Sequence, residues 1–271
     1  MGGERPTLVT KVARAEHGDN HFRGYWLNAE LLGHHSMASI AGLAVGGPAS
    51  SGEDRALLED MAVAVNVADP RIWPLKVTRL VSAYGSMFAG LAAGNITMDR
   101  SLLSMEACCE IAARLVALAE RADDLDDAGL AAYLADAWPE RRPPGFGVPA
   151  RKEDERVVGL VGRVRDVYRR QDRRYFRLFE RVAEVSRVER NLKPNILLVF
   201  SAIALDLGFP PESIGALAWA LVQASFQANA VEGAQTAPEL MRQLPQEHLY
   251  YVGPPDRVSP RAARLRAGRS G

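Results

Sequence analysis

The sequence predicts a mostly α-helical protein, and three observations lead to that fold class. Apolar residues recur at helical spacing along most of the 271 residues. Proline and glycine interrupt that pattern at intervals typical of helix ends. Only the short apolar runs before residue 27 suit strands, so at most a small amino-terminal ribbon accompanies the helices.

Start and stop signals bound several of the expected helices. Gly46-Gly47-Pro48 ends the first helix, and Ser51 caps the second, which Pro70 ends. The arginines of the long range 153–190 are balanced by nearby acids, which predicts a solvated face rather than a nucleic-acid interface. The ranges 195–207 and 211–232 are nearly uncharged and are expected to be core helices. The ranges predicted to be helical are 27–45, 51–69, 75–93, 102–122, 128–138, 153–190, 195–207 and 211–232.

Composition excludes several classes of protein. The formal net charge is zero, so the chain has no general attraction to nucleic acid or to an anionic membrane. No apolar run approaches the ~20 residues of a membrane span, and residues 1–10 lack the apolar core of a signal peptide, so a cytoplasmic protein is expected. Adjacent Cys108 and Cys109, like adjacent His34 and His35, point to different faces of a helix. We therefore expect neither a disulfide nor a metal site.

One turn is the main candidate binding site. Pro143-Pro144-Gly145-Phe146-Gly147-Val148 stops the preceding helical pattern, and the charged run from Lys152 opens the longest helical pattern of the chain. Glycines let backbone approach a bound group closely, and the free N–H groups of a first helical turn favour anionic atoms such as phosphates. The sequence therefore predicts an anion-binding turn here.

Six segments in order resemble the citrate synthase superfamily. The resemblance is greatest to the short citryl-CoA lyase-like members and covers roughly residues 20 to 257. The matching segments are Phe22-Arg23-Gly24-Tyr25, Ala68-Asp69, Pro144-Gly145-Phe146-Gly147 with Lys152 and Asp154-Glu155-Arg156, Lys193-Pro194-Asn195, Ala228-Asn229-Ala230-Val231-Glu232 and Tyr251-Val252-Gly253-Pro254.

The resemblance implies a helical large domain and a smaller helical domain with the active site in the cleft between them. It also implies a homodimer. The expected division is an amino-terminal arm over 1–26, a large domain over 27–143 and 194–257, a small-domain portion over 144–193, and a flexible tail over 258–271.

This sequence departs from the family at its catalytic positions. The family joins or cleaves an acyl-CoA and a keto acid with an aspartate base and two histidines. Here the positions of those groups, of two further histidines and of a substrate-binding arginine fall on Leu197, Asn95 to Thr97, Val148, Pro70, Asn229 and Val222. The histidines present, His17, His21, His34, His35 and His248, lie elsewhere. Because a dicarboxylic keto acid in a closed cleft needs compensating cations, we predict that oxaloacetate does not bind.

Residues at or beside these positions form the candidate site. The candidates for catalysis are Asn95, Thr97 and Asn229; for substrate contact, Asp69, Phe146, Val148, Leu197 and Val222; and for a CoA or carrier-protein thioester, Gly145, Gly147, Lys152 and Arg156. Structural roles are the alternatives: Asn195 suits a helix cap, Asp69 a turn and Lys152 a solvated charge. No other cofactor and no metal is expected.

Two classes of function stay open. The first is an enzyme that makes, breaks or cyclises carbon–carbon bonds in a neutral, apolar acyl or polyketide-like substrate of specialised metabolism. The second is a non-catalytic relative that binds acyl-CoA or a partner subunit. An enclosed pocket lined by Asn95, Thr97, Val148, Leu197 and Asn229 favours the enzyme, and a filled cleft favours the binding protein. The Arg- and Ala-rich composition is compatible with a high-GC bacterial source.

Overall fold

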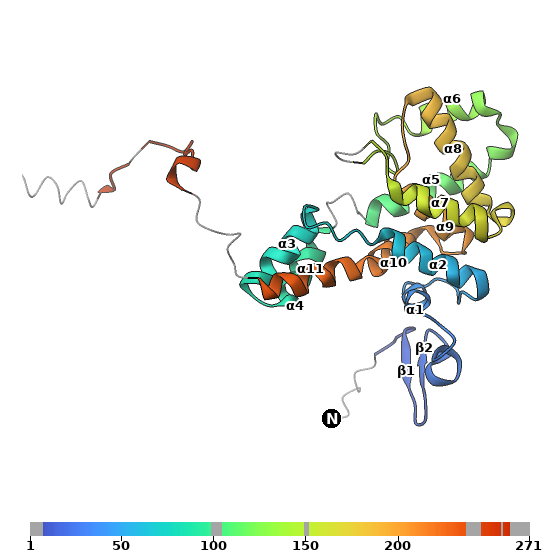
Figure 1. Ribbon diagram of the computed structural model, residues 1–271, viewed down its shortest axis with the longest axis horizontal. Coiled ribbons are helices and arrows are strands. Elements are labelled where there is room, and N and C mark those ends of the chain that lie inside the picture. Colours follow the sequence, from blue (N-terminus) through green and yellow to red (C-terminus); the bar gives the residue numbers. More distant parts are fainter. Residues whose placement is uncertain (1–7, 99–104, 149–151, 237–244, 256, 261–271) are drawn as a thin grey trace, which may run out of the picture. The chain divides into compact units, whose positions relative to one another are not determined.

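The computed structural model describes residues 8–98, 105–148, 152–236, 245–255 and 257–260 (Figure 1). Contacts divide the chain into two compact units, Met1–Ala237 and Pro238–Gly271. In its described part, the second unit contains the short 3₁₀ turn η7 (Gln246–His248). Of the predicted tail over 258–271, all but residues 258–260 lie outside the described residues.

The first unit is built mainly from helices, as predicted. They are α1 (Met37–Ala44), α2 (Gly52–Val65), α3 (Trp73–Tyr84), α4 (Met87–Ile96), α5 (Met105–Ala119), α6 (Asp127–Ala137), α7 (Glu155–Val167), α8 (Arg174–Arg190), α9 (Ile196–Asp206), α10 (Ile214–Leu221) and α11 (Gln223–Gln235). Short 3₁₀ turns η3 (Ala122–Asp124), η4 (Arg170–Asp172) and η5 (Pro211–Ser213) lie between some of them. In the described ranges, every helix is too short or too polar to cross a membrane.

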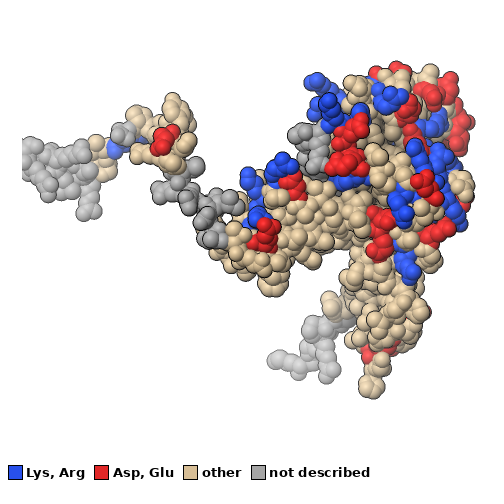
Figure 2. All heavy atoms as spheres, in the orientation of Figure 1, with Lys and Arg blue, Asp and Glu red and all other residues tan. Residues whose placement is uncertain are grey.

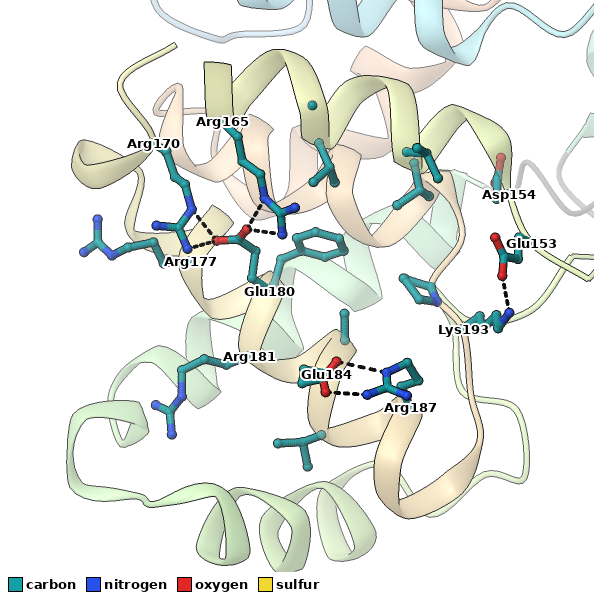
Figure 3. A pocket seen from close by; sticks show the side chains of 18 of the residues that line it. Glu153, Asp154, Arg165, Arg170, Arg177, Glu180, Arg181, Glu184, Arg187 and Lys193 are labelled. Atoms are coloured by element: carbon teal, nitrogen blue, oxygen red, sulfur yellow. Dashed lines mark hydrogen bonds and ion pairs between the residues drawn. The ribbon is translucent and has the colours of Figure 1, made fainter. Parts of the chain in front are cut away.

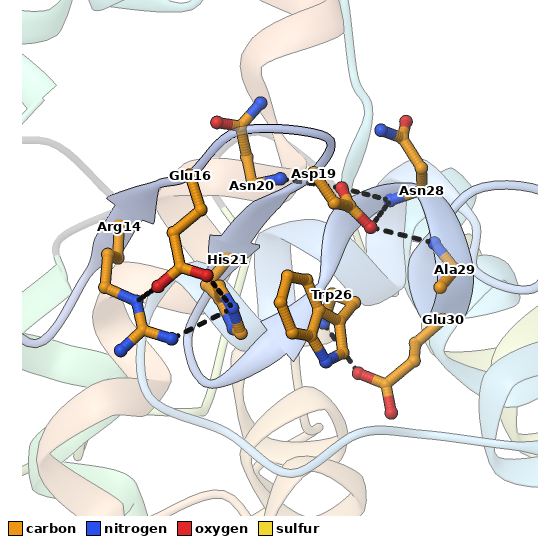
Figure 4. A network of polar contacts seen from close by, with 9 residues as sticks. All are labelled: Arg14, Glu16, Asp19, Asn20, His21, Trp26, Asn28, Ala29 and Glu30. Carbon is orange, nitrogen blue, oxygen red and sulfur yellow. Dashed lines mark hydrogen bonds and ion pairs between the residues drawn. The ribbon is translucent and has the colours of Figure 1, made fainter.

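The amino-terminal ribbon precedes the helices. Strands β1 (Ala13–Ala15), β2 (Asn20–Phe22) and β3 (Tyr25–Trp26) pair antiparallel in that order, and a π-helix, η1 (Leu27–Leu31), follows. The carboxylate of Asp19 accepts hydrogen bonds from the amides of Asn28 and Ala29, at 3.0 and 3.2 Å, and so ties the β1–β2 turn to η1 (Figure 4). Arg23 and Gly24 have φ of 51° and 91°, a left-handed turn that glycine adopts without strain.

Helix α9 forms the centre of the core. Every residue from Ile196 to Leu205 is buried, and α9 packs against α2, α5, α7 and α8. A helix that is apolar on all sides must be covered all round, so the prediction of a core helix over 195–207 is confirmed. The amino-terminal end of α9 carries the segment Lys193-Pro194-Asn195, which places that segment beside the core.

Helices α3, α4 and α11 pack together as a second cluster, which Figure 1 shows around the label α3. Gly90 and Gly94 are the buried residues of α4, and they face Ser82 and Thr78 of α3. Gly233 of α11 meets the backbone of Arg79 in the same way. Missing side chains at these points let the helix backbones approach closely.

The structure divides two predicted helices at serine caps. The predicted helix 75–93 is wrong as a single element, because Ser86 accepts a hydrogen bond from the Ala89 amide at 3.2 Å and starts α4. The predicted helix 27–45 likewise becomes η1 and α1. There Ser36 accepts a hydrogen bond from the Ser39 amide at 3.2 Å. In both places a serine inside the apolar pattern starts a new helix.

Two more predicted helices are also divided. The range 153–190 becomes α7 and α8, separated by η4 and by Arg169, whose φ of 42° is left-handed. The range 211–232 becomes η5, α10 and α11, and the last two helices meet at Val222. Apolar residues continue across the break at Val222, and the polar break at residues 169–173 contains neither proline nor glycine, so the sequence pattern did not reveal either break.

Two acidic side chains of α2 hold α7 and the segment after it. The Tyr168 hydroxyl donates to Asp60 Oδ2 at 2.5 Å, and Arg163 Nε donates to the same oxygen at 2.7 Å. Arg173, which is buried, donates to Asp54 Oδ1 at 2.5 Å. These contacts fix the α7–α8 pair against α2 and so fix the helix that follows the candidate turn.

Candidate functional site

The predicted turn is pinned to the segment that precedes α9. Gly147 donates its amide to the Lys193 carbonyl at 2.9 Å, and the Asn195 amide donates to the Gly145 carbonyl at 2.8 Å. The Asn195 side chain also donates to the Gly147 carbonyl at 3.1 Å. Gly145 and Gly147 have φ of 90° and 78°, so both positions favour glycine. Two segments that the sequence singled out separately therefore lie against each other.

Asp154 joins the amino-terminal ends of α7 and α9. Its buried carboxylate accepts two side-chain hydrogen bonds from Arg156, at 2.7 and 2.8 Å, and one from the Ile196 amide at 2.9 Å. Burial acts to raise the pKa of Asp154, but the hydrogen bonds and charge of Arg156 and the Ile196 amide hold the pKa below its usual value. The guanidinium of Arg156 is thus directed at Asp154, and its role toward a ligand stays a prediction.

A cavity of about 330 Å³ opens beside this turn. Positive charge surrounds it from Arg142, Lys152 and Lys193, of which Lys193 pairs with Glu153. The contact with Lys193 lowers the pKa of the Glu153 carboxyl. The residues that line the cavity are Arg142, Gly147, Val148, Lys152, Glu153, Asp154, Asn191, Leu192, Lys193 and Pro194. Because Asp154 is already paired with Arg156, the cavity has an excess of positive charge.

The apolar candidates lie mostly in the core. Leu197, in the first turn of α9, and Val222, between α10 and α11, are both buried. Phe146 is buried with its ring 6.1 Å from that of Trp138. Val148 is half-buried and lines the cavity, so among these side chains it is the one next to space for a ligand.

Asn95 is fully engaged by its neighbours. Its Oδ1 accepts hydrogen bonds from Trp219 Nε1 at 2.8 Å and from Gln223 Nε2 at 3.0 Å. Its Nδ2 donates to the Leu91 carbonyl at 2.8 Å. Asn95 therefore fixes α4 to the α10–α11 junction. Thr97 ends α4, and its hydroxyl donates to the Gly94 carbonyl at 2.8 Å.

Asn229 connects two of the predicted segments. Its Nδ2 donates to the Ala68 carbonyl at 3.0 Å and to the Ser225 carbonyl at 2.9 Å. Asn66 adds to the same network, since its Oδ1 accepts from the amide and the hydroxyl of Ser225, both at 3.0 Å. Asp69 accepts a hydrogen bond from the exposed Arg71 at 2.6 Å. The end of α2 and α11 are thereby held together.

The structure gathers part of the predicted site at one cavity. Gly147, Val148 and Lys152 line it, whereas its lining does not include Asn95, Thr97, Leu197 or Asn229. Sequence reasoning missed Trp219 and Gln223, the partners of Asn95. Their spacing of four residues puts both on one face of the chain from α10 into α11, but it does not identify what they contact.

Comparisons with known proteins rest on structure, because no family model matches the chain and no curated protein matches its sequence. The citryl-CoA lyase from Hydrogenobacter thermophilus superposes with a TM-score of 0.74 over 96% of this chain and 100% of that one, at 21% identity. The chain has the citrate synthase fold. The likeness to citryl-CoA lyase-like and citrate synthase-like proteins inferred from the six segments is therefore confirmed at the level of fold.

Two further proteins with the citrate synthase fold are longer than this chain. An ATP citrate lyase from Methanosaeta concilii, a D541A mutant in complex with (3S)-citryl-CoA, has a TM-score of 0.71 and 16% identity over 93% of this chain and 42% of that one. Citrate synthase from Thermotoga maritima has a TM-score of 0.60 and 20% identity over 82% and 58%. The chain thus spans less than two thirds of the length of these two proteins.

Proposed function

We propose that this chain binds an acyl thioester of CoA, or of a carrier protein, beside the turn Pro143–Val148. The cavity there carries the proposal, because the positive charge of Arg142, Lys152 and Lys193 suits phosphate groups. Gly147, with its φ of 78°, places no side chain between the turn and a ligand, while its own amide and carbonyl stay hydrogen-bonded to Lys193 and Asn195. The fold supports the same conclusion, since an ATP citrate lyase with this fold was solved in complex with citrate and coenzyme A.

The proposed reaction makes, breaks or cyclises a carbon–carbon bond in a neutral, largely apolar acyl or polyketide-like substrate. Leu197 and Val222 stand where the resemblance places an acid and an arginine, and both are buried among apolar side chains. Arg156 is held by Asp154. Oxaloacetate would bring two carboxylates, which need compensating cations in a closed site. Asn95, Thr97 and Asn229 remain the proposed polar contacts, and Asp69 and Phe146 the further substrate contacts.

A calorimetric titration with CoA, followed by a turnover assay, tests this function. We expect Lys152→Ala to weaken CoA binding about tenfold, because one charge-assisted contact to phosphate is lost. Lys11→Ala, which removes a lysine that does not line the cavity, is the matched control. With acetyl-CoA and oxaloacetate we expect no sustained release of thiol. Equal CoA affinity for both variants, or sustained turnover with oxaloacetate, contradicts the proposal.

A non-catalytic binding protein is the second candidate function. Two observations favour it. The amide groups of Asn95 and Asn229 already hydrogen-bond within the protein. Of the five residues whose shared pocket would favour the enzyme, only Val148 lines the cavity beside the turn. Native mass spectrometry of protein taken from its cell extract, before and after incubation with acyl-CoA, separates the candidates. Conversion of the bound acyl group supports the enzyme, and an unchanged ligand supports the binding protein.

We further propose that the protein works as a homodimer. Helices α3, α4 and α11 expose large apolar side chains, among them Phe88 and Ile96 of α4. The surface over these helices is mostly uncharged in the view of Figure 2, whereas charges crowd over α6, α7 and α8. A second copy of the chain is the proposed occupant of this face.

A further inference from the structure

A groove between α7 and α8 has features that the proposed thioester site does not use. Its volume is about 1040 Å³, and it meets the smaller cavity only at Glu153, Asp154, Lys193 and Pro194. Figure 3 shows it with α7 above and α8 below. Such a volume lies at the upper end of ordinary small-molecule pockets. The groove's two ends differ in charge, and that difference indicates what it can hold.

Positive charge is concentrated at one end. The carboxylate of Glu180, with its side chain 11% exposed, accepts hydrogen bonds from Arg165 Nε and Arg170 Nε, each at 2.7 Å (Figure 3). Each guanidinium has five N–H donors in a rigid plane, so this contact orients donors that stay available. Glu180 therefore works as an internal support that holds two arginines in place.

Arg177 lies at the rim of this end, where its guanidinium points away from Glu180 and donates to the Gln171 carbonyl (Figure 3). The two guanidinium groups of Arg165 and Arg170 against the one carboxylate of Glu180 leave one positive charge uncompensated. Arg177 contributes a second positive charge at the rim, so the end as a whole carries two. The end of the groove formed by Arg165, Arg170, Arg177 and Glu180 is called the arginine end below.

The rest of the groove is apolar or neutral. Val157, Val158 and Val161 line it from α7, on one face of that helix. Phe179, Ala183 and Val185 line it from α8. At the opposite end the charges cancel, because Glu184 pairs with Arg187 at 2.6 Å and Lys193 pairs with Glu153.

We propose that this groove binds a phosphate monoester of a short aliphatic chain, with the phosphate at the arginine end and the chain along the valines of α7. A phosphate monoester carries close to two negative charges at neutral pH, which matches the two uncompensated charges. Guanidinium groups bind phosphate oxygens through paired N–H donors. A nucleic acid or an acidic helix would place anionic groups along the whole groove, where the far end offers only neutral pairs.

Octyl phosphate is the probe that tests this site, titrated into the full chain by calorimetry. We expect octyl phosphate to bind at least about tenfold more tightly than octanol, which lacks the phosphate group, or than inorganic phosphate, which lacks the alkyl chain. Octanoate, with a single charge, should bind with intermediate affinity. Equal binding of octanol and octyl phosphate, or no binding of octyl phosphate, overturns the proposal.

Three variants locate the ligand. Arg177→Gln should weaken octyl phosphate binding about tenfold. The fold should be preserved, because Asp206, the buried carboxylate whose charge Arg177 favours, keeps its hydrogen bonds to the Tyr175 and Phe176 amides. Val158→Glu, at a site 66% exposed, should weaken binding by placing a negative charge on the apolar strip. The double variant Glu184→Gln/Arg187→Gln, which removes the ion pair of the neutral end without changing the net charge of the groove, is the matched control and should bind as the wild type does. Equal losses in Arg177→Gln and in this double variant overturn the assignment of the phosphate to the arginine end.

The thioester site can be tested apart from this groove. Lys152→Ala alters the smaller cavity and does not touch the groove lining. We expect that variant to lose CoA affinity while its octyl phosphate affinity stays unchanged. Loss of both affinities would mean that octyl phosphate occupies the thioester cavity, which contradicts a second site.

Discussion

Asp206, at the end of α9, shows how one side chain can hold a distant helix. Its two carboxylate oxygens accept the amides of Tyr175 and Phe176, each at 2.8 Å, in the first turn of α8. Burial raises the pKa of Asp206 to about 6, although these two hydrogen bonds and the charges of Arg173 and Arg177 favour the ionised form. The residue that caps α8 thus comes from another helix and not from the preceding sequence.

This raised pKa makes stability depend on pH. Between the ordinary carboxyl pKa of 3.8 and the folded value of about 6, the folded state binds more protons than the unfolded state. The free energy of unfolding should therefore fall as pH rises through that interval, by on the order of 2 kcal/mol, and then level off. Asp154 acts in the opposite sense, because its pKa is lowered and its contribution is lost only in more acidic solution.

Urea denaturation of the wild type and of Asp206→Asn, from about pH 4.5 to about pH 7.5, measures this dependence. The difference between the two proteins isolates Asp206 from the histidines, which titrate in the same interval. We expect the free energy of unfolding to fall less steeply with pH in the variant than in the wild type. Parallel curves would contradict the assignment of the slope to Asp206.

Residues of the candidate site were predictable to the extent that their role is local. Gly145 and Gly147 lie in a turn that the neighbouring prolines predict. Asn195 caps α9, as its position after Pro194 predicts. The partners of Asn95 were not predictable, because Trp219 and Gln223 are 124 and 128 residues away in sequence. Only the packing of α4 on the α10–α11 junction brings them together.

At the scale of elements, the close contact of α3 and α4 depends on glycine. A Cβ added at Gly90 would lie 1.8 Å from Ser82 Oγ and 2.5 Å from the Thr78 carbonyl oxygen. We expect Gly90→Ala to lower the free energy of unfolding by about 2 kcal/mol or more, since backbone atoms of α3 must move. Urea denaturation followed by circular dichroism measures the change.

Gly159 of α7 provides the matched control for that substitution. It also lies inside a helix, but nothing comes within 4 Å of a Cβ built there. Gly159→Ala should therefore stabilise the protein by about 0.5–1 kcal/mol through helix propensity. If Gly90→Ala is neutral or stabilising as well, the helix contact is looser than the structure describes.

The elements themselves were predicted better than their ends. Apolar spacing located every helical region from α1 to α11, and α9 matches its predicted range within a residue at each end. The same spacing did not separate α3 from α4 or α7 from α8. Serine and arginine at these breaks occur inside helices as well as at caps, so only the packed structure decides between the two.

At the scale of the whole molecule, the order of short segments carried more information than any one of them. The turn at Gly145 pairs with Asn195, and Asn229 bonds to Ala68, so segments far apart in sequence meet as the resemblance implied. The fold therefore was predictable, and the chemistry was not. The predicted domain boundaries stay a prediction, since the contacts define units that divide after Ala237 instead of around 144–193.

The proposed dimer is the feature of the whole molecule that is most directly testable. Helix α4 carries no charged residue, yet Phe88 is 73% and Ile96 is 78% exposed. Large apolar side chains on one uncharged helix are typical of obligate subunit interfaces. Phe88→Glu would place a charge on this apolar surface, so we expect it to convert the dimer to a monomer. Light scattering coupled to gel filtration, over a range of concentrations, measures the mass.

Val158→Glu is the control for the dimer, because Val158 is also exposed but belongs to α7. We expect it to keep the mass of the wild type, since the charged surface over α7 and α8 is not part of the proposed interface. A wild-type monomer at every concentration would refute the dimer. Loss of the dimer in Val158→Glu alone would move the interface from the α3–α4–α11 cluster to α7. An interface on α7 would cover one wall of the groove, so octyl phosphate should then compete with dimer formation. With an interface on α4, octyl phosphate binding and dimer formation should be independent.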